Sequence, residues 1–164
     1  FQVYDQIFEK FKNKKITFVE VGTGNGGSLS VWKKYFSKDS RIIGIDFNPE
    51  AKKLENYGFE IYIGNQTKKD FWDSFYNKVG KVDIILDDGG HKMHHQKVSF
   101  NTLWFQFSDG GLYIVEDTHS SYWLGLGGGY RKKTVLLIFP KGWLTGSKAG
   151  RQIRMIFFLS IQWR

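Results

Sequence analysis

The chain of 164 residues carries 24 Lys or Arg, 16 Asp or Glu and no cysteine, and 41% of its residues are hydrophobic. This length and composition indicate one folded domain with its own core and exclude a disordered segment. The lack of cysteine excludes disulfides and thiolate metal sites, and we expect a cytoplasmic location. No apolar run is long enough to cross a bilayer, so a membrane partner is not expected.

The basic charge of the chain is concentrated at its C-terminal end. The formal net charge is +8, yet residues 131–164 hold eight Lys or Arg and no Asp or Glu, which leaves 16 residues of each sign in residues 1–130. Because a neutral domain does not attract nucleic acid, we expect no nucleic-acid partner. We expect a domain over residues 1–130, truncated at its N-terminus because the sequence starts inside a helical pattern, and a basic tail over residues 131–164.

Two interpretations of the tail remain open. Its apolar runs at residues 135–139 and 153–161 are typical of a sixth and a seventh strand of the sheet. The abrupt loss of acidic residues equally fits a segment that is foreign to the fold, such as the product of a shifted reading frame. An intact frame in the parent DNA would exclude the second interpretation.

Apolar, β-branched runs alternate with amphipathic segments before the tail. Strands are expected at residues 16–21, 41–46, 59–63, 82–86 and 112–115. Helices are expected at residues 1–12 and 28–36, after Pro49, and around the apolar residues of segments 71–79 and 98–107. This alternation predicts an α/β fold with a doubly wound parallel sheet, in which ligands bind where the carboxyl ends of the strands meet.

A glycine-rich turn follows the first expected strand. Residues 22–27 match the dinucleotide pattern G-x-G-x-x-G, and with Glu20 they also match the looser E-x-G-x-G-x-G of S-adenosylmethionine sites. Asp46, about 20 residues further on, suits a ribose diol under either interpretation. Glu20 would repel a pyrophosphate but favour the cationic methionine end of a sulfonium cofactor. A purely structural glycine turn is the alternative.

Acidic residues follow two strands that we expect to be neighbours. Asp87 and Asp88 come after the fourth strand, and Glu116 and Asp117 come after the fifth. Four carboxylates in one cleft repel each other unless some are protonated or a cation offsets their charge. Oxygen ligands without thiols favour a hard cation such as Mg²⁺. Helix capping and solvated loop ends are the alternative.

A histidine lies close to this acidic cluster in the sequence. His91 follows Asp88 by three residues and could act as a general base on a hydroxyl, although a histidine in a surface loop is often inert. His94 and His95 are expected on the helix surface without a chemical role. A zinc site formed by the three histidines lacks a recognisable ligand spacing.

Several of these segments resemble one enzyme family. The segments are VEVGTGNGGS, IIGIDFNP, GNQ, ILDDGGH and GGLYIVEDTHSSYW, within about residues 16–125. Together they resemble class I S-adenosylmethionine-dependent methyltransferases, above all the macrolide-sugar O-methyltransferases of the mycinamicin type and the cephalosporin hydroxylase-like proteins. The resemblance implies a Rossmann-like α/β sheet with the central order 3-2-1-4-5 and leaves the C-terminal strands open.

The resemblance also implies roles for individual residues. It implies Mg²⁺ bound by Asp88, Glu116 and Asp117, with His91 as the catalytic base. The residues expected to bind S-adenosylmethionine are Glu20, Gly22, Gly24, Asp46, Asn65, Gln66 and Asp87. Relatives often have Gly-Asp-Gln where this chain has Gly64-Asn65-Gln66, so the side chain at position 65 keeps an acceptor but loses the charge.

These features predict a magnesium-dependent O-methyltransferase. It would move a methyl group from S-adenosylmethionine to a hydroxyl of a sugar or natural-product acceptor, as in antibiotic biosynthesis. Two alternatives stay open, an NAD-dependent oxidoreductase and a non-catalytic remnant of the same fold. A homo-oligomer is also open, and Tyr122 and Trp123 are candidates for an interface, a lid or the core.

Overall fold

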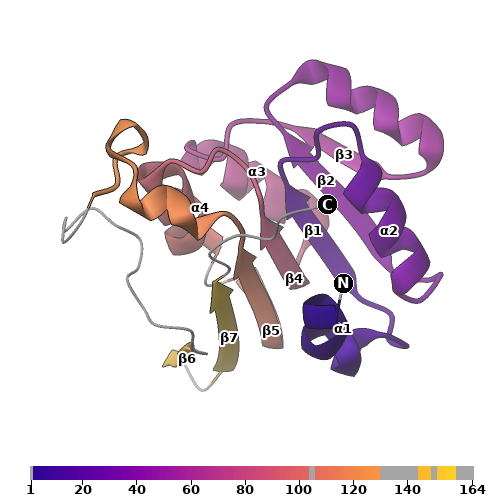
Figure 1. Cartoon of the computed structure of the whole chain (residues 1–164). Helices are drawn as coiled ribbons and strands as arrows, with labels where there is room; N and C mark the ends of the chain where they lie inside the picture. Colours follow the sequence, from indigo (N-terminus) through magenta and orange to yellow (C-terminus); the bar gives the residue numbers. More distant parts are fainter. Residues whose placement is uncertain (1, 104–105, 130–143, 149–150, 158–164) are drawn as a thin grey trace.

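The expected strands pair into one sheet in the computed structural model, which describes residues 2–103, 106–129, 144–148 and 151–157 (Figure 1). The order across the sheet is β3-β2-β1-β4-β5-β7-β6, so the predicted order 3-2-1-4-5 and the Rossmann-like fold are confirmed. In this order, each strand from β3 to β7 runs parallel to its neighbour. The strands are β1 Thr17–Val21, β2 Arg41–Asp46, β3 Glu60–Ile63, β4 Val82–Asp87, β5 Phe107–Val115, β6 Leu144–Lys148 and β7 Arg151–Phe157.

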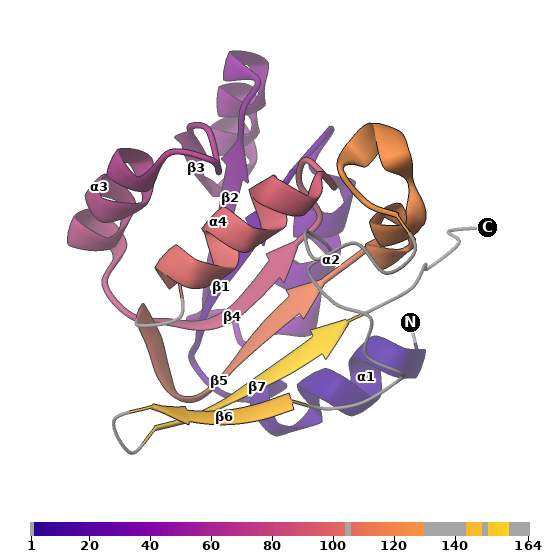
Figure 2. The same ribbon diagram turned by 90° about the vertical axis from the view of Figure 1, so that its left-hand side faces the viewer.

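Two strands of the tail extend the sheet beyond β5. β7 runs parallel to β5, with Leu112 opposite Arg154 and Val115 opposite Phe157, and β6 pairs antiparallel with β7 (Figure 2). β7 overlaps the strand expected at residues 153–161. The strand expected at residues 135–139 lies outside the described residues, and the domain boundary at residue 130 stays a prediction.

Helices connect the strands at the expected places. They are α1 Gln2–Phe8, α2 Gly27–Tyr35, α3 Lys69–Val79 and α4 Met93–Leu103, with short 3₁₀ segments at Glu9–Phe11, Pro49–Tyr57, Thr118–Tyr122 and Leu124–Leu126. The helix expected to include residue 107 ends earlier, at Leu103, and Phe107 instead begins β5 and pairs with Val82 at a register shift. Within the described part of the chain, no helix combines the length and apolar character needed to cross a membrane.

The two faces of the sheet hold separate cores. Successive residues of a strand point to opposite faces. Phe18 of β1 packs on the face that α1 and α2 cover, with Trp32, whereas Val19 packs on the face that α3 and α4 cover, with Trp72. Glu20 shares the face of Phe18, so its carboxylate is buried in the layer of α1 and α2. This alternation decides on which side of the sheet each acidic residue of the site lies.

Candidate active site

The glycine-rich loop after β1 is held in place by the acidic residue at the end of β2. Asp46 Oδ2 accepts hydrogen bonds from Thr23 N and Thr23 Oγ1, both at 3.0 Å, and from Gly24 N at 3.2 Å. Its other oxygen accepts from Asn48 N at 2.8 Å. The residue expected to bind ribose is therefore also the anchor of the loop.

Gly22 is the point at which this loop touches the loop after β4. Its φ is +86°, and a Cβ on it would lie 2.3 Å from the carbonyl oxygen of Asp88. Both the backbone conformation and the close approach require glycine. Gly24 also has a positive φ, of +49°, but a Cβ there would meet no atom within 4 Å.

We expect Gly22→Ala to destabilise the protein more than Gly24→Ala. Both variants carry the cost of a left-handed alanine, about 1–2 kcal/mol, but only Gly22→Ala also forces two loops apart. Thermal unfolding measures the first effect, and titration with S-adenosylhomocysteine measures the accompanying loss of affinity. Equal unfolding temperatures and affinities for the two variants would contradict the loop contact.

A cavity of about 440 Å³ opens at the carboxyl ends of β1 to β4. Four of the residues expected to bind the cofactor or shape its site line it, namely Gly22, Asp46, Asn65 and Gln66. Seven further lining residues were not predicted, and two of them carry large side chains with an aromatic or ionisable ring. These two are Phe47, whose side chain is 75% exposed, and His95, which was expected on the helix surface.

Gln66 connects the segments around this cavity through its side-chain hydrogen bonds. Its Nε2 donates to Asp87 Oδ1 at 3.2 Å and to Ser99 Oγ at 3.0 Å, and its Oε1 accepts from Gly90 N at 2.7 Å. Asp87 is buried and also accepts from Tyr113 Oη at 2.6 Å. Asp87 does not line this cavity. Its carboxylate instead accepts hydrogen bonds from Gln66, which does line the cavity, and from Tyr113.

A second cavity, of about 340 Å³, lies on the α1 and α2 face of the sheet. Its walls include Glu20, Asp88 and Glu116, together with Ser28 at the start of α2. Glu20 is only 2% exposed, and its Oε2 finds no hydrogen-bond partner within the described parts of the chain. Glu116 accepts a hydrogen bond from Tyr4 Oη.

The carboxyl groups of the second cavity hold their protons unusually strongly. Burial raises the pKa of Glu20 to about 8, and the nearby charges of Asp88 and Glu116 add to this effect. Burial likewise raises the pKa of Asp88 to about 7, with further contributions from Glu116, Asp117 and Asp87. Burial also raises the pKa of Glu116, against the opposing hydrogen bond from Tyr4. A cationic ligand would relieve this repulsion.

We therefore expect stability to fall as pH rises from 5 to 8 in protein free of divalent ions. The unfolded chain ionises Glu20 and Asp88 near their ordinary pKa values of 4.5 and 3.8, whereas the folded chain retains these protons up to pH 7 or 8. The folded state then binds more protons over this range, so the free energy of unfolding decreases with pH. Each kcal/mol lost lowers the unfolding temperature by about 2–4 °C.

Calorimetric unfolding temperatures of wild type and Glu20→Gln, measured from pH 5 to 8, test this expectation. The glutamine variant has no charge to bury, so its unfolding temperature should depend less on pH. An equal or steeper decline in the variant would show that Glu20 does not carry the effect.

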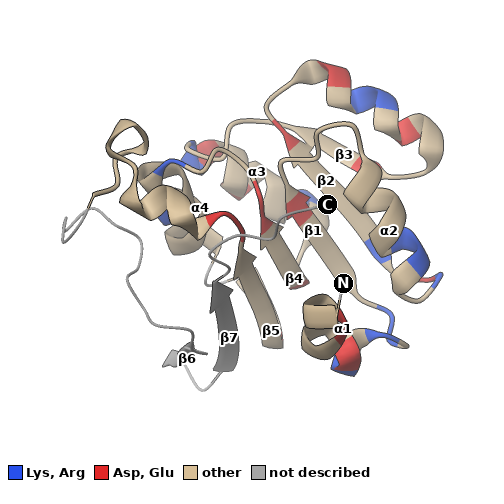
Figure 3. Cartoon of the chain, viewed as in Figure 1, with Lys and Arg blue, Asp and Glu red and all other residues tan. Residues whose placement is uncertain are grey.

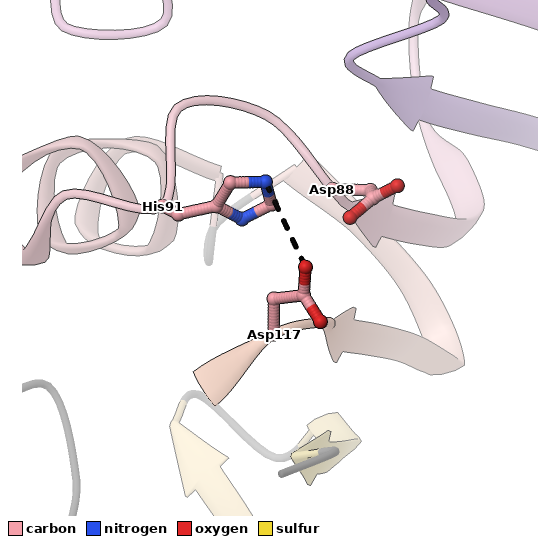
Figure 4. Close-up of side chains that lie close together, drawn as sticks. All are labelled: Asp88, His91 and Asp117. Carbon is pink, nitrogen blue, oxygen red and sulfur yellow. Dashed lines mark ion pairs between the residues drawn. The ribbon is translucent and has the colours of Figure 1, made fainter. Parts of the chain in front are cut away.

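Asp88, His91 and Asp117 point toward one another between the loops after β4 and β5 (Figure 4). One ligand atom from each lies within 4.8 Å of the other two, and His91 Nε2 is 4.0 Å from Asp117 Oδ2. His91 and Asp117 have φ values of 48° and 50°, in the left-handed region that L-residues seldom adopt. Figure 3 shows acidic residues at the carboxyl ends of the central strands.

The structure separates the expected ligand Glu116 from this group of three. Glu116 faces the second cavity, where it contacts Tyr4, while the adjacent Asp117 faces His91. Asp88 belongs to both arrangements, since it lines the second cavity and approaches His91 and Asp117. The three expected metal ligands thus lie at the same edge of the sheet, but only Asp88 and Asp117 approach each other, while Glu116 faces the second cavity.

Two residues that were not predicted from the sequence, His119 and Tyr4, belong to this region. His119 Nδ1 lies 3.6 Å from Asp117 Oδ1, and its ring contacts that of Trp123 with centroids 4.9 Å apart. His119 stands two residues after Asp117, a spacing that could have been noticed. Nothing in the amphipathic pattern of α1 could have indicated that Tyr4 reaches Glu116.

Among known proteins, the chain is similar in sequence to sugar O-methyltransferases. No protein-family model matches the chain. The chain is 33% identical over 138 residues to the 8-demethyl-8-alpha-L-rhamnosyl tetracenomycin-C 2'-O-methyltransferase of Streptomyces olivaceus, covering 80% of this chain and 36% of the relative. It is also 33% identical over 132 residues to the mycinamicin VI 2''-O-methyltransferase of Micromonospora griseorubida, covering 76% of this chain and 33% of the relative.

The chain is also similar to solved structures of a methyltransferase. The MycE methyltransferase of the mycinamycin pathway, in complex with Mg and SAH, superposes with a TM-score of 0.75 at 30% identity, over 82% of this chain and 35% of that chain. A second structure of MycE also contains mycinamycin VI and gives a TM-score of 0.73 at 32% identity, over 78% of this chain and 36% of that chain.

The chain therefore has the class I S-adenosylmethionine-dependent methyltransferase fold. Within that class its sequence resembles the macrolide-sugar and tetracenomycin-rhamnose O-methyltransferases, which confirms the predicted resemblance. The chain spans about a third of the length of these relatives.

Proposed function

We propose that the chain is the cofactor-binding and catalytic part of a magnesium-dependent O-methyltransferase that uses S-adenosylmethionine. The observation that carries this proposal is that Gly89 and Gly90, which line the 440 Å³ cavity together with Gly22 of the glycine-rich loop, stand in the chain between Asp88 and His91 of the group that also includes Asp117. A cavity for a nucleoside next to a cluster of acids and a histidine supports a group transfer to a hydroxyl.

The residues around the first cavity fit the cofactor. Asp46 has carboxylate oxygens at the place where a ribose would lie, and the loop from Gly22 brings backbone close to the ligand. Glu20 lines the second cavity and not the first, and its buried Oε2, which has no hydrogen-bond partner in the described structure, suits a cationic group such as the methionine amine. The two relatives compared above are methyltransferases, whereas a dehydrogenase of 11% identity and TM-score 0.51 shares only the fold.

The acidic residues fit a hard cation. Asp88 and Asp117 offer carboxylate oxygens near one point, and Glu116 lies next to Asp117 in the chain. Asp88, Glu116 and Asp117 would hold Mg²⁺, with the Tyr4 hydrogen bond to Glu116 exchanged for the metal. A bound Mg²⁺ supplies a positive charge that lowers the pKa of an acceptor hydroxyl and stabilises the alkoxide.

His91 is placed to remove the proton of that hydroxyl. Its Nε2 faces the acidic group, 4.0 Å from Asp117 Oδ2, and is the ring atom that would take the proton. The left-handed backbone at His91 fixes the ring toward this point. Binding both ligands so that acceptor oxygen, methyl carbon and sulfur lie in line would lower the remaining barrier.

The acceptor we propose is a hydroxyl of a sugar on a natural product, with no nucleic acid or membrane involved, in a cytoplasmic enzyme. An exposed apolar ledge supports this choice. It consists of Tyr122, Trp123 and Leu124, which are 48%, 56% and 72% exposed. It begins beside the acidic group, because the Trp123 ring contacts His119, which lies next to Asp117. The apolar face of a sugar ring or macrolide would pack on this ledge.

We expect Trp123→Ala to raise KM for the acceptor about tenfold while leaving cofactor affinity unchanged, because Trp123 belongs to the ledge and does not line the first cavity. Tyr57→Ala, at an exposed aromatic residue of the Pro49–Tyr57 segment, is the control. A KM that stays at the wild-type value in Trp123→Ala would place the acceptor elsewhere.

Transfer of a labelled methyl group from S-adenosylmethionine to a panel of glycosylated macrolides and polyketides tests the proposed reaction. Transfer that requires Mg²⁺ supports it. Reduction of nicotinamide cofactor by the same panel, without methyl transfer, would replace it with the oxidoreductase alternative. Cofactor binding without either reaction would favour a non-catalytic domain.

A further inference from the structure

His95 of α4 forms part of the wall of the 440 Å³ cavity. The loop after β4 packs directly on its ring, because a Cβ added to Gly90 would lie 2.0 Å from His95 Nδ1. The imidazole therefore lies against this loop, in the wall of the cavity that Asn65 and Gln66 also line. The preceding residue, His94, is exposed, and its ring contacts that of His95 with centroids 4.2 Å apart.

Most other hydrogen-bond acceptors of the cavity side chains are already engaged. Asn65 Oδ1 accepts from Thr67 N at 2.9 Å and Thr67 Oγ1 at 2.8 Å. Gln66 Oε1 accepts from Gly90 N at 2.7 Å. Asp46 is the residue assigned to the ribose, so its carboxylate does not serve the base. His95, in contrast, makes no hydrogen bond to any residue in the parts of the chain that the structure describes.

The surroundings of this ring favour its neutral form. Burial lowers the pKa of His95, and the nearby His94, Lys92 and His91 lower it further. A neutral imidazole has one nitrogen that accepts a hydrogen bond. The same cavity extends from Asp46 to the loops after β3 and β4 and to His95, so a nucleoside whose ribose lies at Asp46 has room for its base beside His95.

We propose that His95 recognises the adenine ring of the cofactor by accepting a hydrogen bond from its exocyclic amine. The inference rests on the proposed function, since it assumes that the cavity binds S-adenosylmethionine. It assigns to α4 a role in choosing the base, in addition to its packing against the sheet. His95 becomes a binding and specificity residue, without contact to the reacting atoms.

The test compares two ligands and several variants by isothermal titration. The ligands are S-adenosylhomocysteine and its analogue with hydrogen in place of the exocyclic amine. We expect wild type to prefer S-adenosylhomocysteine about tenfold, the effect of one buried hydrogen bond. His95→Ala should bind both ligands equally, at the affinity of wild type for the analogue. His95→Gln, which retains an acceptor, should recover part of the preference, and His94→Ala should keep all of it.

Each result separates this inference from the proposed function. An unchanged preference in His95→Ala, with tight binding of S-adenosylhomocysteine by wild type, would overturn the role of His95 and leave the methyltransferase proposal intact. Failure of folded wild type to bind S-adenosylhomocysteine would overturn both.

Discussion

Replacing His91 is expected to reduce methyl transfer by about 10²- to 10⁴-fold, the usual contribution of a general base, while S-adenosylhomocysteine still binds. His91 lies outside the first cavity, so cofactor affinity does not depend on its ring. Two variants are informative. His91→Ala removes the imidazole but places alanine at a φ of 48°. His91→Asn also removes the base, and asparagine tolerates the left-handed conformation.

The comparison with a nearby histidine makes this result specific. His94→Ala, on the exposed side of α4, should retain wild-type turnover. Mg²⁺ affinity measured in the same samples distinguishes a base from a metal ligand, because the structure also groups His91 with Asp88 and Asp117. Wild-type turnover in His91→Asn would rule out the base, and a large loss of Mg²⁺ affinity would make His91 a ligand instead.

Asp117→Asn is expected to weaken Mg²⁺ binding about tenfold or more and to reduce turnover in parallel. The substitution removes one negative charge from an oxygen site, and affinity for a hard cation depends on the charge of its ligands. Asparagine accepts the φ of 50° at this position, so the loop should keep its shape. The stabilisation that saturating Mg²⁺ gives in thermal unfolding measures the loss.

Asp39→Asn is the matched control, because Asp39 is an exposed carboxylate in the loop that follows α2. It should leave both the magnesium-induced stabilisation and turnover unchanged. If Asp117→Asn is stabilised by Mg²⁺ as strongly as wild type and Asp39→Asn, the ion binds elsewhere or not at all.

The fold was predictable because each strand carries its own signal. Apolar, β-branched runs such as Ile42 to Ile45 end at polar residues, and the helices between them follow a period of 3.6. The start of β5 was not predictable, because Phe107 is apolar and fits the end of a helix as well as the start of a strand. Only its pairing with Val82 in the sheet decides the question.

The candidate site was predictable only as far as residues stand at the carboxyl ends of strands. Gly22, Asp46, Asn65 and Gln66 line one cavity as expected, because parallel strands bring their ends to one edge. The direction of each side chain depends on tertiary contacts. Asp87 turns beneath the sheet edge toward Tyr113, and Glu116 turns toward Tyr4, which is far away in the sequence.

His95 and His119 show why the remaining site residues were missed. Each reaches the site through its place on a short helix whose angle to the sheet the sequence does not specify. His95 enters the cavity because Gly90 lets the preceding loop pack on its ring. His119 approaches Asp117 because Asp117 adopts the left-handed conformation that begins the Thr118–Tyr122 turn.

Isothermal titration of the chain with S-adenosylhomocysteine, with and without Mg²⁺, tests the central claim most directly. We expect saturable binding at one site per chain, and an additional heat from Mg²⁺ that Asp117→Asn loses. Absence of binding by a sample whose circular dichroism and thermal transition show a folded protein would contradict the claim that this cavity holds the cofactor of a methyltransferase.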